Sequence, residues 1–241
     1  MRNQPSSHPK PVTEIWRPDW VALPRLTLAR RLFRPIALGL LKLISFFTMR
    51  PTVSGMENFP KEGPALVVIN HLGDADAVLL GASIPYPIEA LGKIELHDHP
   101  LVGRIFRAYG VIWIHRGRPD RKALRAALDG LAEGRVVSVA PEGRESLTGA
   151  LEDGNEGAAF IALKSGAPIV PIVMTGTENN NTYGHLKRYK RAQVTLTVGK
   201  PFHLQVHSDR QTMLREGTRQ IMETLAAMLP ESYQGNYKSL S

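Results

Sequence analysis

A histidine and an aspartate five positions further along the chain are the side chains of this sequence best placed for proton chemistry. His71 follows an apolar, β-branched run at 65–69, and Asp76 lies near the start of a second apolar run at 75–83. These runs predict a buried strand followed by a helix, which puts both side chains at the carboxyl end of a strand, where open α/β sheets carry their chemistry. Asp76 can then hold one imidazole nitrogen while the other takes a proton from a substrate hydroxyl. The alternative is a capping hydrogen bond without a catalytic role.

Charged groups that follow two later strands indicate an anion site. Arg116 ends a run of strand-forming residues, and a guanidinium at a strand end offers two parallel donors to a phosphate. In the Pro-Glu-Gly-Arg turn that follows the next strand, Gly143 lets backbone N–H groups approach a phosphate, Arg144 pairs with it, and Glu142 binds polyol hydroxyls or holds the arginines. The alternatives are a solvated charge at Arg116 and a turn with a local salt bridge. His115 points to the opposite face of its strand and is not a catalytic candidate.

Four short blocks occur in a fixed order along the chain. They are Asn70-His71-x4-Asp76, Gly110-x5-Arg116, Pro141-Glu-Gly-Arg-Glu-Ser146 and Ala167-Pro-Ile-Val-Pro-Ile-Val173. Together they resemble the glycerolipid (lysophospholipid) acyltransferase superfamily, which includes the 1-acylglycerol-3-phosphate acyltransferases, and the resemblance covers about residues 50–205. The first block alone is a weak signal, whereas four ordered blocks are fairly specific.

The resemblance assigns roles to particular residues. It implies catalysis by His71 with Asp76, and substrate binding by Lys93, Arg116, Glu142, Gly143 and Arg144. Lys93 stands where a basic residue commonly precedes the second block, and its alternative is a plain surface lysine. The third block departs from the family pattern, because Arg144-Glu145 stands where Thr-Arg is usual. The displacement leaves open which face the guanidinium of Arg144 reaches.

The fourth block is linked by the resemblance to the pocket for the acyl donor, with Pro171 as its residue in this chain. The alternative is a buried strand with no direct role. A proline inside a run of strand-forming residues indicates an edge strand or a bulge.

The implied reaction moves a fatty acyl group from a thioester of CoA or acyl carrier protein to the free hydroxyl of a lysophospholipid. The expected acceptor is 1-acyl-sn-glycerol 3-phosphate, which gives phosphatidic acid. The chain has no cysteine and no Gly-x-Ser-x-Gly elbow, so direct transfer fits better than a covalent intermediate. We expect no cofactor and no metal, because the thioester already carries a good leaving group. Two alternatives stay open: another lyso-lipid or a non-phosphate acceptor, and a non-catalytic lipid-binding domain at a membrane surface.

The positive charge of the chain is concentrated at its start. The net charge of the 241 residues is +8, and residues 1–50 carry nine Arg and Lys against two acidic residues. A nucleic-acid-binding protein would carry its basic residues on the folded domain, so we expect no nucleic-acid partner. Here the excess lies beside an apolar segment, which indicates an anionic membrane surface as partner. The expected location is peripheral or monotopic on the cytoplasmic face of a membrane.

Three segments divide the chain. Residues 1–24 form a polar arm rich in proline, expected to be extended or poorly ordered, whose Trp16 and Trp20 lie at lipid headgroups or pack on the domain. Residues 25–50 are basic and then apolar, with Pro35 expected to break or kink the chain. The apolar stretch is too short to span about 30 Å of hydrocarbon, so it predicts membrane-interface helices or, alternatively, a core-packing helix.

Residues 51–241 predict one α/β domain with a mostly parallel or mixed sheet flanked by helices, because short apolar runs alternate with helical stretches. The predicted strands are 65–69, 88–91, 111–115, 135–140, 168–174 and 193–198. The predicted helices are 75–83, 100–109, 119–133, 156–165 and 209–229. The hydrophobic fraction of 43% is enough for one sizeable core.

Overall fold

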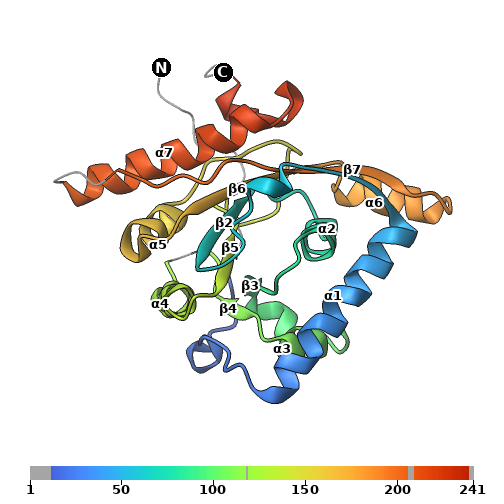
Figure 1. The fold of residues 1–241 in the computed structure, drawn as a ribbon, viewed down its shortest axis with the longest axis horizontal. Helices are drawn as coiled ribbons and strands as arrows, with labels where there is room; N and C mark the ends of the chain where they lie inside the picture. The colour runs from blue at the N-terminus through green and yellow to red at the C-terminus, as the bar shows by residue number, and fades with distance from the viewer. Residues whose placement is uncertain (1–11, 118, 206–208, 239–241) are drawn as a thin grey trace.

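A seven-stranded sheet runs through the middle of the molecule, and its strands follow the order β1-β7-β6-β2-β5-β3-β4 (Figure 1). The computed structural model describes residues 12–117, 119–205 and 209–238. Its strands are β1 (Met49–Ser54), β2 (Ala65–Ile69), β3 (Ile88–Lys93), β4 (Ile112–Ile114), β5 (Val136–Val139), β6 (Ile169–Thr175) and β7 (Ala192–Val198). The predicted α/β fold is confirmed, and each of the six predicted strands is present within a residue or two at its ends.

The carboxyl ends of five strands meet at one edge of the sheet. Neighbouring strands β6, β2, β5, β3 and β4 all run parallel, while β7 is antiparallel to β6 and β1 is parallel to β7. Lys93, the last residue of β3, pairs in register with Ile114, the last residue of β4. The residues that end or follow β2, β5, β3 and β4 therefore lie along this edge, in the order His71, Glu142, Lys93 and Arg116.

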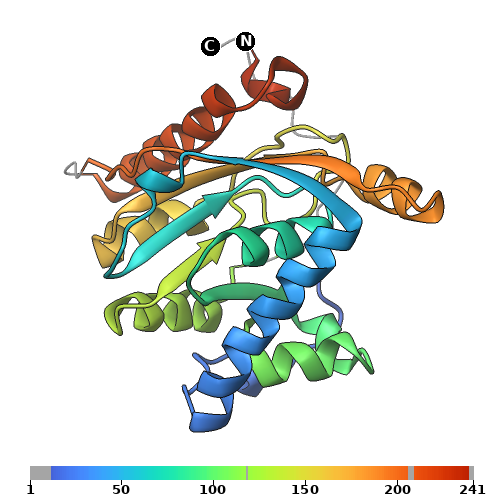
Figure 2. The ribbon, with the colours of Figure 1, turned by 45° about the vertical axis from the view of Figure 1, so that its right-hand side comes forward.

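Helices cover both faces of the sheet (Figures 1 and 2). The helices of the described chain are α1 (Leu28–Thr48), α2 (Ala75–Ser83), α3 (Val102–Tyr109), α4 (Arg121–Ala132), α5 (Gly157–Ser165), α6 (Asn179–Lys187) and α7 (Arg210–Met228), of which α6 lies beyond the end of β7 rather than over a face. Short 3₁₀ helices occupy Pro18–Trp20, Met56–Asn58, Ile94–Asp98, Glu231–Tyr233 and Gly235–Tyr237. Along β2 the side chains alternate: Leu66 and Val68 join the core under α4, α5 and α7, whereas Ala65 and Val67 join the core under α2.

α1 is a single helix that continues through Pro35, so the expected break there is wrong. Thr27 caps its start by accepting the N–H of Arg30. Proline removes one hydrogen bond inside a helix, but the neighbouring residue Arg34 is buried and fixed to the domain, which offsets that loss. α1 packs along α2, where Leu38 and Leu41 approach Gly81. No helix among the described residues is long and apolar enough to cross a membrane.

Two elements were not predicted. β1 begins at Met49, inside the segment predicted to be helical, and α6 lies between the predicted strands 168–174 and 193–198, where no helix was predicted. β1 is an edge strand with five exposed residues and a proline, so it lacks the alternation that reveals a half-buried strand. α6 begins with three asparagines and contains a glycine, which have low helix propensity. Both elements therefore form because of tertiary contacts rather than because of a local sequence pattern.

The described part of the N-terminal arm lies against the domain. The ring of Trp16 lies 4.2 Å from that of His115, and the ring of Trp20 lies 3.8 Å from that of His97. Thr13 exchanges two bonds with Arg116: its N–H donates to the Arg116 carbonyl at 3.0 Å, and its hydroxyl accepts the Arg116 N–H at 2.7 Å. Of the two arrangements considered for Trp16 and Trp20, the structure shows packing on the domain. Residues 1–11 of the arm lie outside the described chain.

Pro171 lies in an internal strand, so its predicted place at a sheet edge is wrong. β6 pairs with β2 on one side and with β7 on the other. The carbonyl of Pro171 accepts the N–H of Gly199 at 2.8 Å, whereas the β7 ladder begins only at Ile172. The N–H and C=O of one residue point to the same side of a strand, so an N–H at position 171 would point toward β7, as the carbonyl does. At this position β6 is not yet paired with β7 in the ladder, so the missing N–H leaves no ladder bond unmade.

Candidate active site

The imidazole of His71 is held at the carboxyl edge of the sheet by Asp76, from the first turn of α2. His71 Nδ1 lies 2.7 Å from Asp76 Oδ2, which also accepts the N–H groups of Leu72 at 2.7 Å and Gly73 at 3.0 Å. A carboxylate only accepts, so Nδ1 carries the proton of the neutral ring. Nε2 then has a free lone pair, and no described residue bonds to it. The His71 side chain is 30% exposed, against 1% for Asp76, so Nε2 is open to a substrate.

The backbone of His71 is fixed from two sides. Its N–H donates to Glu142 Oε1 at 3.1 Å, and its carbonyl accepts the N–H of Ser146 at 2.7 Å. Just before it, the buried amide of Asn70 donates to the carbonyl of Met174 at 2.9 Å and accepts its N–H at 2.8 Å. These bonds lock the end of β2 to β6 and to the loop after β5. The position of the imidazole is therefore set before a substrate arrives.

Glu142 supports the backbone of His71 by hydrogen bonding. Its carboxyl is buried, with Oε1 on the His71 N–H and Oε2 on the N–H of Glu152 at 2.8 Å. Gly143 has φ +75° and donates its N–H to the carbonyl of Ala140 at 3.0 Å, which closes the turn. A Cβ at Gly143 would lie 2.7 Å from the amide of Asn155, so glycine is required here. Binding of substrate by Glu142 and Gly143 stays a prediction.

Arg144 points into the protein. Its Nε and Nη2 donate to Glu152 Oε2 at 2.8 and 2.6 Å, and both side chains are about 95% buried. Glu152 also accepts the N–H of Leu147 through Oε1 at 2.9 Å. The pair thus holds the loop whose Ser146 N–H bonds to the His71 carbonyl, and this is what the displaced arginine does in the described structure. Phosphate binding by Arg144 stays a prediction.

Two further cations lie along the same edge. β3 is two strand spacings from β2, or about 10 Å, and β4 is roughly 14 Å away. Lys93 as a residue is half-buried, and its ammonium forms no ion pair with any described residue. Arg116 is 25% exposed, and its contact with Glu95 is loose, with Nη2 and Oε1 3.7 Å apart. Because the guanidinium of Arg116 is partly exposed and this one ion pair is loose, it can take an incoming anion.

Charges around His71 favour its protonated form. Burial of the ring lowers the pKa of His71, but the hydrogen bond and charge of Asp76 and the charges of Glu145 and Glu142 outweigh that effect, so the pKa lies above its usual 6.5. Burial raises the pKa of Glu142 to about 7, although the N–H donors of Glu152 and His71 oppose the rise.

A second histidine–aspartate pair with the same spacing, His115 and Asp120, differs from the first in whether Nε2 is available to a substrate. His115 Nδ1 lies 2.7 Å from Asp120 Oδ2, as in the first pair. However, its Nε2 accepts the backbone N–H of Arg17 at 2.9 Å, and the side chain is fully buried. This imidazole has no lone pair left for a substrate, so it is a structural residue that holds the N-terminal arm.

The family model described as Acyltransferase matches residues 50–175, just over half of the chain. The chain belongs to the acyltransferase family. Its curated relatives include the 1-acyl-sn-glycerol-3-phosphate acyltransferase of Borreliella burgdorferi, 31% identical over 130 residues that cover 53% of this chain and 52% of the relative. The enzyme of that name in Bacillus subtilis is 27% identical over 154 residues, 63% of this chain and 73% of the relative.

A third relative of the same name, from Chlamydomonas reinhardtii, is 30% identical over 188 residues, 77% of this chain and 54% of the relative. This acyltransferase-family chain thus spans about half the length of most of the relatives named here. The crystal structure of the 1-acyl-sn-glycerophosphate (LPA) acyltransferase PlsC from Thermotoga maritima has a TM-score of 0.62 and 22% identity, and the match covers 84% of each chain. That likeness shows the shared fold.

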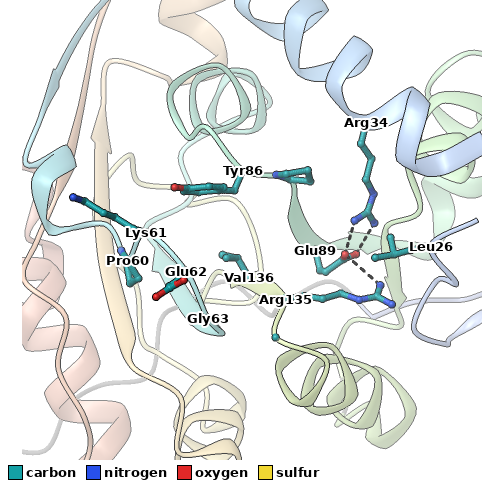
Figure 3. A pocket seen from close by; sticks show the side chains of 12 residues that line it. Leu26, Arg34, Pro60, Lys61, Glu62, Gly63, Tyr86, Glu89, Arg135 and Val136 are labelled. Carbon is teal, nitrogen blue, oxygen red and sulfur yellow. Dashed lines mark hydrogen bonds and ion pairs between the residues drawn. The ribbon is translucent and has the colours of Figure 1, made fainter. Parts of the chain in front are cut away.

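Within this family fold, a cavity of about 260 Å³ lies at the opposite, amino edge of the sheet (Figure 3). Glu89 of β3 projects into it and accepts two bonds from Arg34 of α1, at 2.6 and 2.8 Å, and one from Arg135 at 3.3 Å. Arg34 and Glu89 are almost completely buried. This cluster ties α1 to the sheet and lies far from His71, so the cavity is not part of the candidate active site.

Several supporting residues gave no sequence signal. Glu152 lies eight residues after Arg144 in a loop without periodicity, so no pattern connects the two. Glu95 and Glu145 also become part of the site only when separate loops meet. Asn70 was visible as the residue before His71, but its bonds to Met174 cross more than a hundred residues of chain. The hydrogen-bonded pair His71 and Asp76 was predictable because both its members lie on one local turn.

Proposed function

We propose that this protein transfers a fatty acyl group from an acyl thioester to the free hydroxyl of a lysophospholipid, with 1-acyl-sn-glycerol 3-phosphate as the main acceptor. The observation that carries the proposal is the open Nε2 of His71, whose Nδ1 is held by the buried Asp76 at 2.7 Å. Membership of the acyltransferase family and the names of the relatives support the reaction class. The donor is acyl-CoA or acyl carrier protein.

The proposed step is a direct transfer. His71 Nε2 takes the proton of the acceptor hydroxyl, and the oxygen attacks the carbonyl carbon of the thioester. The new C–O ester bond forms as the C–S bond breaks, and the imidazolium returns its proton to the departing thiolate. Asp76 keeps the ring in the required tautomer and stabilises the imidazolium, as the acid does in hydrolase triads. The fixed backbone of His71 supports this role, since positioning contributes several kcal/mol to catalysis.

Lys93 and Arg116 bind the phosphate of the acceptor in this proposal. Both lie on the edge that carries His71, and neither is engaged in a tight ion pair with a described residue. A phosphate held there places the glycerol between the cations and the imidazole. Arg144 is bound to Glu152 instead, so fewer arginines are available to bind the phosphate of the acceptor. This observation favours a second candidate function, an acyltransferase of the same family with another lyso-lipid as acceptor.

An acceptor panel tests the substrate. The full chain is incubated with labelled acyl-CoA or acyl carrier protein and with lysophosphatidic acid, other lysophospholipids or monoacylglycerol, and the labelled products are separated. We expect the highest kcat/KM with lysophosphatidic acid. Arg116→Met should raise KM for that acceptor about tenfold, because a charge-assisted bond is lost, while Arg121→Met, an exposed arginine of α4, should not. Preference for a phosphate-free acceptor would refute the proposed substrate, and absence of any product would refute the activity.

The rate should depend on pH through His71. Only the neutral imidazole accepts a proton, and the pKa of His71 is raised above 6.5, so kcat/KM should fall as the pH decreases through a value above 6.5. The negative charge of Glu145 contributes to the rise. Glu145→Gln should therefore move this acid limb to lower pH in a pH–rate profile, whereas Glu156→Gln, an exposed residue at the start of α5, should leave it in place. A shift to higher pH in Glu145→Gln would contradict the assignment.

α1 is the membrane contact in this proposal, on the cytoplasmic face of an anionic membrane. Six of its apolar side chains are half or more exposed and follow one another at intervals of three or four, which we call the α1 stripe: Leu28, Leu32, Ile36, Leu40, Leu43 and Phe47. The opposite face of the helix is buried on the domain. An apolar stripe flanked by exposed Arg31, Lys42 and Arg50 is typical of a helix that lies in a membrane interface. Its test is combined with the vesicle experiment below.

A further inference from the structure

The corner between α6 and β7 presents an aromatic side chain to solvent on a strained backbone. Tyr189 is 99% exposed and has φ +54°, and it is the one residue other than glycine with positive φ in the described chain. Its N–H donates to the carbonyl of Leu186, and the N–H of Lys190 donates to that of His185. These two bonds form a Schellman cap, in which the position of Tyr189 is usually glycine. Tyrosine here costs stability and makes no packing contact that would offset it.

Cations surround this tyrosine. Lys187, Arg188 and Lys190 are all exposed, and none of the three forms an ion pair with a described residue. We call residues 186–190 the α6 tip. A concentration of three unpaired positive charges beside an exposed tyrosine and the half-exposed Leu186 is suited to an anionic surface that also has an apolar layer beneath its charges.

The α6 tip is continuous with the α1 stripe. Arg191, the next residue, donates from Nε to the carbonyl of Met49 at 2.7 Å, and its guanidinium lies 5.1 Å from the ring centre of Phe46. Phe46 and Phe47 are both more than 60% exposed at the end of α1. Both ribbon views show α6 beside this end of α1 (Figures 1 and 2). The two surfaces therefore meet.

The other end of α6 contacts the candidate active site. Asn179 accepts the N–H of Asp74, in the loop between His71 and α2, at 2.9 Å and donates to Glu145 at 3.2 Å. The hydroxyl of Tyr183 donates to the Asp74 carboxylate at 2.9 Å. α6 is nine residues long, so the tip lies about 13 Å from the catalytic loop. If the tip contacts a membrane surface, α6 therefore sets the distance between that surface and the loop that carries Asp74.

We infer that the α6 tip is a second membrane contact, which inserts Tyr189 at headgroup depth and sets Lys187, Arg188 and Lys190 against anionic lipid phosphates. The inference rests on the proposed docking of α1. A single helix lying on a bilayer leaves the domain free to rotate about the helix axis. A second contact beside the end of α1 removes that freedom and turns the carboxyl edge of the sheet, with His71, toward the lipid. The exposed phenylalanines and tyrosine favour a bilayer over an acidic protein, which has no apolar layer for them.

Vesicle sedimentation of the full chain tests this contact. The vesicles are phosphatidylcholine with or without phosphatidylglycerol, and the variants are the tip triple Lys187→Gln/Arg188→Gln/Lys190→Gln, Tyr189→Gly, and Phe47→Gln in the α1 stripe. The matched control is Lys61→Gln/Arg121→Gln/Lys164→Gln, which removes three exposed charges elsewhere. We expect the tip triple to weaken binding to anionic vesicles by about a hundredfold, or about fivefold per cation, and the control triple by far less. Tyr189→Gly should weaken binding severalfold while raising Tm, because glycine relieves the positive φ.

The outcomes separate this inference from the proposed function. If the tip triple binds like the control triple while Phe47→Gln loses binding, α1 docks alone and the tip inference is wrong. If no variant changes binding, membrane docking itself fails and the tip inference falls with it. If vesicle binding is unchanged but the tip triple raises KM for acyl-CoA or acyl carrier protein, the tip binds the donor and the inference is overturned. Activity of the wild type with a monomeric short-chain acceptor tests the catalytic proposal separately, since that assay needs no membrane.

Discussion

Replacing His71 with alanine is expected to lower kcat/KM for acyl transfer by on the order of 10²–10⁴-fold without unfolding the protein. The variant loses the only imidazole nitrogen that the described site offers to a substrate hydroxyl. The bonds that fix this position use the backbone N–H and C=O of residue 71, to Glu142 and from Ser146, and alanine keeps both. Asp76 still accepts two backbone N–H groups, so its buried carboxylate stays solvated by the protein.

The measurement is the initial rate with labelled acyl-CoA and lysophosphatidic acid, together with circular dichroism and Tm. His203→Ala is the control, because it removes an exposed histidine from a loop after β7. The control should keep the wild-type rate. A natively folded His71→Ala protein that transfers acyl groups at the wild-type rate would exclude His71 as the base. If instead the wild type itself formed no acylated product, the non-catalytic lipid-binding alternative would be preferred.

Replacing Glu89 with alanine is expected to lower the free energy of unfolding by about 3–5 kcal/mol, because it leaves buried positive charge without its partner. Arg34 would keep two backbone acceptors, the carbonyls of Tyr109 and Gly110, but lose both oxygens of the carboxylate. For a chain of this size the loss corresponds to a decrease in Tm of roughly 6–20 °C. The loss should be felt most by α1, since Arg34 is its main polar anchor to β3 (Figure 3).

Glu133→Ala is the matched control. Glu133 also pairs with Arg135, but its side chain is 55% exposed, so its removal should cost less than about 1 kcal/mol. Urea unfolding monitored by circular dichroism measures both variants. The double variant Arg34→Met/Glu89→Leu should be less destabilised than Glu89→Ala, because it removes the stranded charge with its partner. Equal, small losses in Glu89→Ala and Glu133→Ala would show that the buried cluster contributes no more than a surface pair.

The sequence by itself determined the elements whose pattern is local. Apolar runs bounded by turns located six of the seven strands, and helical periodicity located five helices, including α7, to within about two residues. His71 and Asp76 were also predictable as a bonded pair, because a strand end and the first turn of the next helix bring positions five apart together. The ordered blocks located the charged residues on the carboxyl edge, since parallel strands share that edge.

Only the tertiary structure decided the features that depend on distant partners. It keeps α1 intact through Pro35, gives β1 its place at the sheet edge, and directs Arg144 to Glu152 rather than outward. It also distinguishes two histidine–aspartate pairs of identical spacing. The N–H of Arg17 donates to His115 Nε2, whereas His71 Nε2 has no bonding partner among the described residues. Spacing along the chain fixes which groups can bond locally. Access to solvent and substrate depends on what folds over those groups from elsewhere, and no local pattern records it.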